Sequence, residues 1–209
     1  MSLMLQASPA LIPLWHGLEK GMTPEAAAAA LRGIDGISTV QIERKKGREA
    51  ELKIEYSEAG ISVGPRKVKV DPSFVDDRLS TVTLSHTDCD EAAEQALIDF
   101  GNGLQSKYPN RQRETVVNDK GVVEGVRQSY FNAATRVTVS LVFYDPETIE
   151  RKSVRAYEKE RSARRQCYSN GGKLTTIYLE YRSQVEFTSE QRQESDEREK
   201  MKINTADGL

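Results

Sequence analysis

The chain has 209 residues, and its 37% hydrophobic and 30% charged content is typical of a soluble folded protein. A chain of this length can bury roughly 70% of the surface that its unfolded form exposes, so it needs no metal or disulfide to fold. The net charge of −2 argues against nucleic-acid binding over the whole surface, and no apolar run reaches the length of a membrane span.

The first helix signal along the chain lies at Thr23. This residue can accept hydrogen bonds from the free amides of a helix start, Pro24 suits the first helical position, and Glu25 complements the helix dipole. Helix-forming residues continue to Leu31, and Gly33 offers a stop. The sequence predicts a helix of about nine residues, too short to be stable without packing.

Alternating hydrophobic residues follow this helix. The alternation in residues 40–42 and 52–56, separated by a basic turn at residues 44–48, predicts an antiparallel hairpin with one buried face. Two more short strands are expected at residues 67–70 and 79–84, separated by Asp71-Pro72-Ser73 and the pair Asp76-Asp77.

A second helix is predicted to begin at Thr87 or Asp88, with a capping box formed by the acidic residues at 90 and 91. Its apolar stripe has the spacing of one helical face: Ala93, Ala96, Leu97, Phe100 and Leu104. Gly101-Asn102-Gly103 indicates that the helix weakens or ends there, before Pro109.

Strands are predicted again at residues 114–117, 122–131, 136–144 and 173–187. Between the last two, Asp145-Pro146-Glu147 resembles the first helix start, and a charged helix to about Cys167 is expected. Residues 188–209 carry many charges and no aromatic residue, which indicates a frayed helix or a disordered tail.

Together these elements predict an α+β fold: an antiparallel sheet with two or three helices packed on one face. The segment Glu91–Leu97 matches Glu25–Leu31 at five of seven positions, which favours two similar helix-plus-meander halves. Such a short match also arises by coincidence in unrelated helices. The expected divisions are residues 1–86, 87–187 and a tail at 188–209.

The segment Leu18-Glu19-Lys20-Gly21-Met22-Thr23-Pro24-Glu25 resembles the opening of small bacterial outer-membrane lipoproteins of the SmpA/OmlA (BamE-like) group. In that family a Gly-Met-Thr turn starts a helix, which an antiparallel sheet follows. The resemblance implies a scaffolding role in the cell envelope and transfers no functional residue. A duplicated helix-plus-meander is also similar in architecture to the beta-lactamase inhibitory protein, at the level of fold alone.

The two cysteines, Cys89 and Cys167, are too few for a disulfide scaffold and have the wrong spacing for a zinc knuckle. They are compatible with one bridge in an oxidising compartment, or with two separate buried thiols. Cys89 lies near His86 at a predicted helix start, where a thiolate would be stabilised. The alternative is that the neighbouring polar residues cap the helix and Cys89 packs as a small apolar side chain.

Binding residues are predicted in two places. If the segment after residue 145 is helical, four basic side chains form one stripe suited to a phosphate backbone, an acidic partner or anionic headgroups: Arg151, Lys152, Arg155 and Lys159. Its alternative role is a solvated face. Tyr178 and Tyr181, in the last strand, combine apolar area with a polar tip and suit a binding surface, although such tyrosines also occur at the edge of a core.

No nucleotide loop, hydrolase elbow or metal-ligand motif occurs in the sequence, so no cofactor or metal is expected. We therefore expect a non-enzymatic binding or scaffolding protein of the bacterial cell envelope, periplasmic or secreted, whose partner is another protein. One alternative is an intracellular, cytoplasmic module that binds nucleic acid or an anionic partner through the basic helix. The other is a small thiol-dependent enzyme centred on Cys89.

Overall fold

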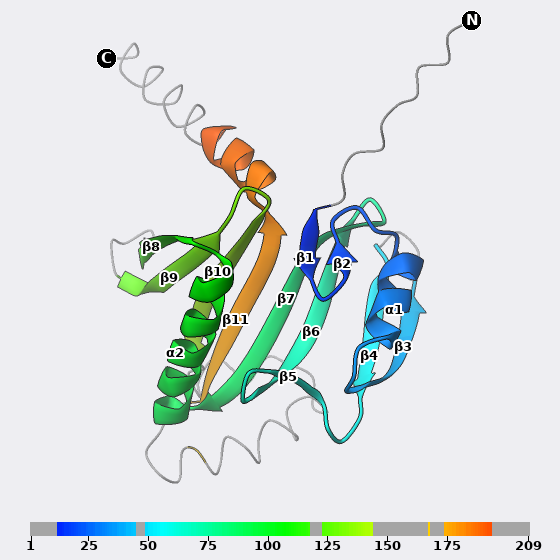
Figure 1. Ribbon diagram of the computed structural model, residues 1–209, viewed down its shortest axis with the longest axis horizontal. Helices are drawn as coiled ribbons and strands as arrows, with labels where there is room; N and C mark the ends of the chain where they lie inside the picture. The colour runs from blue at the N-terminus through cyan, green and yellow to red at the C-terminus, as the bar shows by residue number, and fades with distance from the viewer. Residues whose placement is uncertain (1–11, 45–48, 118–122, 144–166, 168–173, 194–209) are drawn as a thin grey trace, which may run out of the picture.

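The computed structural model describes residues 12–44, 49–117, 123–143, 167 and 174–193. The chain is an α+β protein built on a seven-stranded sheet in the order β5-β6-β7-β11-β10-β9-β8, and every neighbouring pair is antiparallel (Figure 1). Its strands are β5 (Ile61–Val63), β6 (Arg66–Val75), β7 (Arg78–Cys89), β8 (Asn110–Val117), β9 (Val123–Phe131), β10 (Thr135–Phe143) and β11 (Leu174–Ser183).

Two small hairpins and two labelled helices complete the architecture. The hairpins are β1 (Pro13–Trp15) with β2 (Leu18–Glu19), and β3 (Ile37–Glu43) with β4 (Glu51–Tyr56). The helices are α1 (Pro24–Arg32) and α2 (Asp90–Lys107), and a further helix spans residues 184–193, directly after β11.

Helices α1 and α2 pack on the same face of the sheet. Figure 1 views the molecule from that side, and both helices contribute to one continuous hydrophobic core. Side chains from three neighbouring strands meet on this face. Val82 of β7 and Val137 of β10 both pair with Tyr181 of β11, and all three side chains are buried in the core. The predicted fold class is confirmed.

The start of α1 agrees with the sequence. Thr23 Oγ1 accepts a hydrogen bond from Ala26 N at 3.3 Å, Pro24 is the first helical residue, and Gly33 caps the end. Ala27, Ala28 and Leu31 face the core and are buried. Because the cap, the helix formers and the stop are all local signals, this element could be predicted from sequence alone.

The hairpin β1–β2 was not predicted. His16 and Gly17 both have positive φ, at 43° and 80°, which gives the tight reversal between its strands. Leu14, Trp15 and Leu18 are nevertheless almost fully buried, and Thr135 Oγ1 donates to Pro13 O at 2.6 Å. The hairpin is therefore held by contacts with a distant part of the chain rather than by a local pattern.

The predicted start of the second helix is wrong. α2 begins at Asp90, the N-cap residue Cys89 makes no side-chain cap, and Thr87 and Asp88 belong to β7. Strand pairing accounts for the shift, because Thr87 pairs with Thr176 of β11 and their hydroxyl oxygens lie 2.8 Å apart.

Gly101 and Gly103 do not end α2, which continues to Lys107. Gly101 has a structural reason, since a Cβ there would lie 2.9 Å from Tyr130 Oη, and Tyr130 is buried beneath the helix. A Cβ at Gly103 would meet nothing within 4 Å.

These two glycines provide a matched test of that close approach. We expect Gly103→Ala to raise the free energy of unfolding by about 1 kcal/mol, because alanine favours the helix. Gly101→Ala should be at least about 1 kcal/mol less stable than Gly103→Ala, because Tyr130 must move in a packed core. Urea denaturation of both variants measures the difference, and equal gains would contradict the close approach.

Strand β6 runs through the predicted break at Asp71-Pro72-Ser73. Pro72 is tolerated because β6 pairs with β7 on one side, while β5 covers only its first residues on the other. On that open edge Tyr56 Oη accepts from Val70 N at 2.8 Å and donates to Val70 O at 3.3 Å. Backbone groups two residues apart point the same way, so the nitrogen of Pro72 lies on the same edge, where no ladder partner is needed.

We expect Tyr56→Phe to lower the free energy of unfolding by about 1 to 3 kcal/mol, because the variant leaves the amide of the buried residue Val70 without its partner. Tyr108→Phe is the matched control: Tyr108 is buried, and its hydroxyl makes no hydrogen bond to another described residue. Thermal denaturation compares the two variants. Equal losses would show that the hydrogen bonds of Tyr56 contribute nothing.

Candidate functional site: the open face of the sheet

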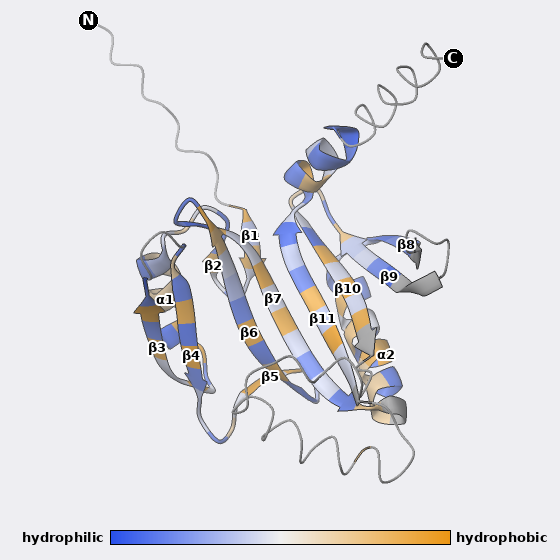
Figure 2. Cartoon of the chain, turned by 180° about the vertical axis from the view of Figure 1, so that it is seen from behind, coloured by the Kyte–Doolittle hydropathy of each residue, from blue (hydrophilic) through white to orange (hydrophobic). Residues whose placement is uncertain are grey.

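The face of the seven-stranded sheet opposite α1 and α2 is called here the open face, and Figure 2 views it with both helices behind the sheet. Polar side chains from neighbouring strands meet on it in register: Thr83 of β7, Glu180 of β11, Thr138 of β10 and Ser129 of β9 form one row. The alternation that buries Leu179 on one side places Glu180 on the other.

Two adjoining depressions hollow this face. The first, of about 350 Å³, is lined by hydroxyl-bearing side chains and by the charged residues Glu114, Arg127, Glu180 and Arg182. The second, of about 490 Å³, lies towards β4 and β5 and includes Lys67 and Lys69 in its wall. Tyr178 lines both depressions and so lies between them.

The two tyrosines selected from the sequence have different places. Tyr178 is on the open face, between the depressions. Tyr181 is 5% exposed and packs in the core on the helix side, where burial raises its pKa well above the ordinary range for tyrosine. Tyr181 is therefore not available at a binding surface, because an odd separation along a strand puts two side chains on opposite faces.

Arg136 was not selected from the sequence, yet it is the most unusual charged residue of this face. It lies on β10 two residues before Thr138 and is only 2% exposed. Its Nη2 donates to Gln112 Oε1 at 3.0 Å, and its Cζ lies 3.9 Å from the centre of the Phe187 ring. Burial lowers the pKa of Arg136, although an arginine keeps its charge at neutral pH.

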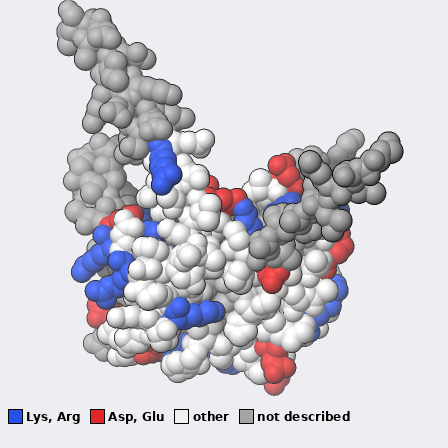
Figure 3. Space-filling view, turned by 45° about the horizontal axis from the view of Figure 1, so that its top comes forward, with Lys and Arg blue, Asp and Glu red and all other residues white. Residues whose placement is uncertain are grey.

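The predicted basic stripe of Arg151, Lys152, Arg155 and Lys159 lies outside the described residues, so the structure does not place it. The same holds for the expected helix between residues 146 and 166 and for residues 194–209 of the predicted tail. The strand predicted to reach residue 187 ends at Ser183, and residues 184–193, which include the start of the predicted tail, are helical. In the view of Figure 3, basic and acidic side chains of the described residues are both present, with uncharged residues between them. That face is not uniformly basic.

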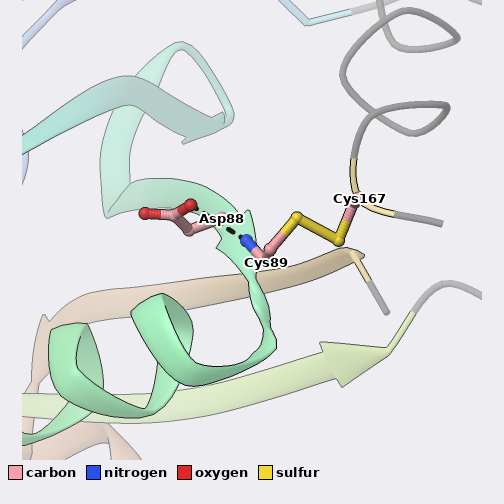
Figure 4. The surroundings of a disulfide bond; sticks show 3 residues. All are labelled: Asp88, Cys89 and Cys167. Carbon is pink, nitrogen blue, oxygen red and sulfur yellow. Dashed lines mark hydrogen bonds between the residues drawn. A yellow bond between two sulfur atoms is a disulfide. The ribbon is translucent and has the colours of Figure 1, made fainter. Parts of the chain in front are cut away.

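Cys89 and Cys167 form a disulfide, with their Cα atoms 5.8 Å apart (Figure 4). Cys89 is the last residue of β7, and its amide donates to Asp88 Oδ1 at 2.9 Å. Both sulfurs are engaged in this bond, so Cys89 has no free thiol in the oxidised protein. His86, the histidine near Cys89 in the sequence, has Nδ1 2.8 Å from Lys67 O and packs its ring against Phe100.

The acidic residues near this junction are engaged with Arg66 of β6. Its Nε and Nη2 both lie close to Asp99 Oδ2 of α2, at 3.1 and 3.0 Å, and Asp88 Oδ2 is 3.8 Å from Nη1. Hydrogen bonds from Gln95 and from Arg66 lower the pKa of Asp99. This cluster fastens α2 to the sheet, which is a structural role.

Within the described residues, no group of histidine, cysteine and carboxylate side chains is arranged to hold a metal ion, and no helix is long and apolar enough to cross a membrane. Compared with known proteins, the chain matches no family model, no curated protein and no solved structure.

Proposed function

We propose that the protein is a non-enzymatic binding or scaffolding protein that contacts another protein through the open face of its sheet. The observation that carries this proposal is the pair of adjoining depressions around Tyr178, on the side of the sheet opposite α1 and α2. A wide, hollowed sheet face with mixed charges offers many weak contacts rather than one reactive centre.

The side chains of this face support a protein partner. Tyrosine and arginine are enriched where proteins meet, because each combines a large contact area with hydrogen-bonding groups. Tyr178, Arg127 and Arg182 supply these groups, and the hydroxyl-bearing residues between them can bond to a partner's backbone.

We further propose that the protein works in an oxidising compartment, as a periplasmic or secreted protein. The Cys89–Cys167 disulfide supports this location, because such bonds persist outside the reducing cytoplasm. The resemblance of residues 18–25 to envelope lipoproteins agrees with it. The strand order also suits two similar halves, since β7 and β11, the last strands of each predicted half, pair at the centre of the sheet.

Site-specific photo-crosslinking in the native host tests the binding role. A photoreactive residue at Ser140 on the open face should give a discrete protein adduct, whereas one at Ile98, exposed on α2, should give none. The adduct partner, once purified, should bind the wild-type protein at least tenfold more tightly than the Tyr178→Ala variant. Adducts at Ile98 alone would place the contact on the helices and overturn the proposal.

A further inference from the structure

Two arginines face each other directly on the open face. Arg136 of β10 and Arg182 of β11 are cross-strand partners in the antiparallel ladder. Like charges in this position repel, and the proximity of Arg182 adds to burial in lowering the pKa of Arg136. This pair therefore costs electrostatic free energy, which a ligand of opposite charge would offset.

The donors of this pair are incompletely satisfied among the described residues. Within that part of the chain, Arg136 makes one side-chain hydrogen bond, to Gln112, and the carboxylate oxygen of Glu114 lies 3.9 Å from its Nη2. The Nε atoms of Arg136 and Arg182 are both buried without a hydrogen-bond partner among the described residues. Buried donors without acceptors are costly, and guanidinium groups are well matched to a carboxylate.

The helix of residues 184–193 already presents suitable chemistry to these arginines. Phe187 lies with its ring centre 3.9 Å from Arg136 Cζ and 5.3 Å from Arg182 Cζ, a geometry of cation–π attraction. Glu190, three residues later and therefore on the same helical face, places Oε2 2.5 Å from Arg182 Nη2. An aromatic residue and an acidic residue, one helical turn apart, thus contact the two arginines.

This helix is held loosely. None of its residues is buried, and the Val185 side chain is 60% exposed. Among the described residues, Glu186 of this helix forms an ion pair with Lys20 in the N-terminal part of the protein. The described residues of this helix therefore bury little apolar surface against the sheet, so the segment can leave the arginines at little cost.

We propose that Arg136 and Arg182 recognise a short helical segment of the partner protein that carries an aromatic residue and, one turn later, an acidic residue. Residues 184–193 occupy this place in the free protein, and the partner's segment displaces them. The proposal rests on the proposed function, because it names the partner chemistry that the open face accepts.

The test uses the full-length chain and a fluorescent synthetic peptide with the sequence of residues 184–193. We expect a Phe187→Ala/Glu190→Ala variant, whose own helix no longer fills the site, to bind this peptide at least tenfold more tightly than the wild type. Adding Arg182→Gln to that variant should abolish most of the gain. Adding Arg113→Gln, which removes an exposed charge of β8 that lines neither depression, should leave it unchanged.

Three controls separate the possible causes. Peptides with alanine at the phenylalanine, or glutamine at the acid facing Arg182, should each bind several-fold more weakly, and acetate at the peptide's concentration should not compete. Circular dichroism checks that each variant is folded. If Arg182→Gln is not folded, Arg182→Lys should still weaken binding, because lysine lacks the planar fork of arginine.

Equal peptide binding by the wild type and the Phe187→Ala/Glu190→Ala variant overturns this inference. Crosslinks at Ser140 in that case would leave the proposed function standing.

Discussion

Removing the Cys89–Cys167 disulfide by a double alanine substitution is expected to lower the free energy of unfolding by about 4 kcal/mol. The bond joins residues separated by 78 positions, and a bridge closing so long a loop removes much of the unfolded chain's entropy. Urea denaturation of the variant and of the oxidised wild-type protein measures the loss.

Reduced wild-type protein is the matched control, because it keeps both sulfur atoms and lacks only the bond. It should unfold at nearly the same urea concentration as the double variant. Cys89 pairs with Leu174 at the end of the β7–β11 ladder, so amide exchange should rise first at that end. Identical stability of the oxidised and reduced proteins would show that the bond constrains nothing.

The same bond tests the proposed compartment. Protein purified from its native host under alkylating conditions should show no free thiol after unfolding, and two after reduction. Two free thiols before reduction would place the protein in a reducing environment and contradict the envelope location.

Replacing Gly36 by alanine is the second substitution with a large expected effect, a loss of at least about 3 kcal/mol. Gly36 has a φ of 95°, and a Cβ there would lie 2.1 Å from the carbonyl oxygen of Gly60. The turn before β3 therefore rests directly on the backbone before β5, and neither side can yield without shifting its strand. Thermal or urea denaturation measures the loss.

Gly64→Ala is the control for this substitution. Gly64 also has a positive φ, of 59°, but a Cβ there would meet nothing within 4 Å. Its loss should stay near 1 to 2 kcal/mol, the cost of a left-handed backbone alone. Equal losses at the two sites would mean that the contact with Gly60 adds nothing.

The elements that the sequence predicts well are those with local causes. The cap at Thr23 and the alternation in β3 and β4 each depend on residues within a few positions of one another, and both are found. The hairpin of β1 and β2 was missed because its stability comes from contacts such as that of Pro13 with Thr135. The place of Gly101 likewise depends on Tyr130, which no pattern in α2 reveals.

The candidate site was predicted only in part, for a similar reason. The alternation of β11 identifies the strand, but it does not say which set of side chains meets the helices, so Tyr178 and Tyr181 were selected together. Arg136 lies in a strand whose alternating pattern predicts that its polar side chains face solvent. Its burial arises from Phe187, a residue of a different element, and so required the assembled fold.

The position of β11 between β7 and β10 has a consequence for biosynthesis. During translation the ribosome releases β5, β6 and β7 first, then β8, β9 and β10, and these two groups share no ladder with each other. Both leave an unpaired edge of backbone amides and carbonyls until residues up to 183 emerge. The nascent chain must therefore keep these two unpaired edges apart, and the seven-stranded sheet can close only after β11 has emerged.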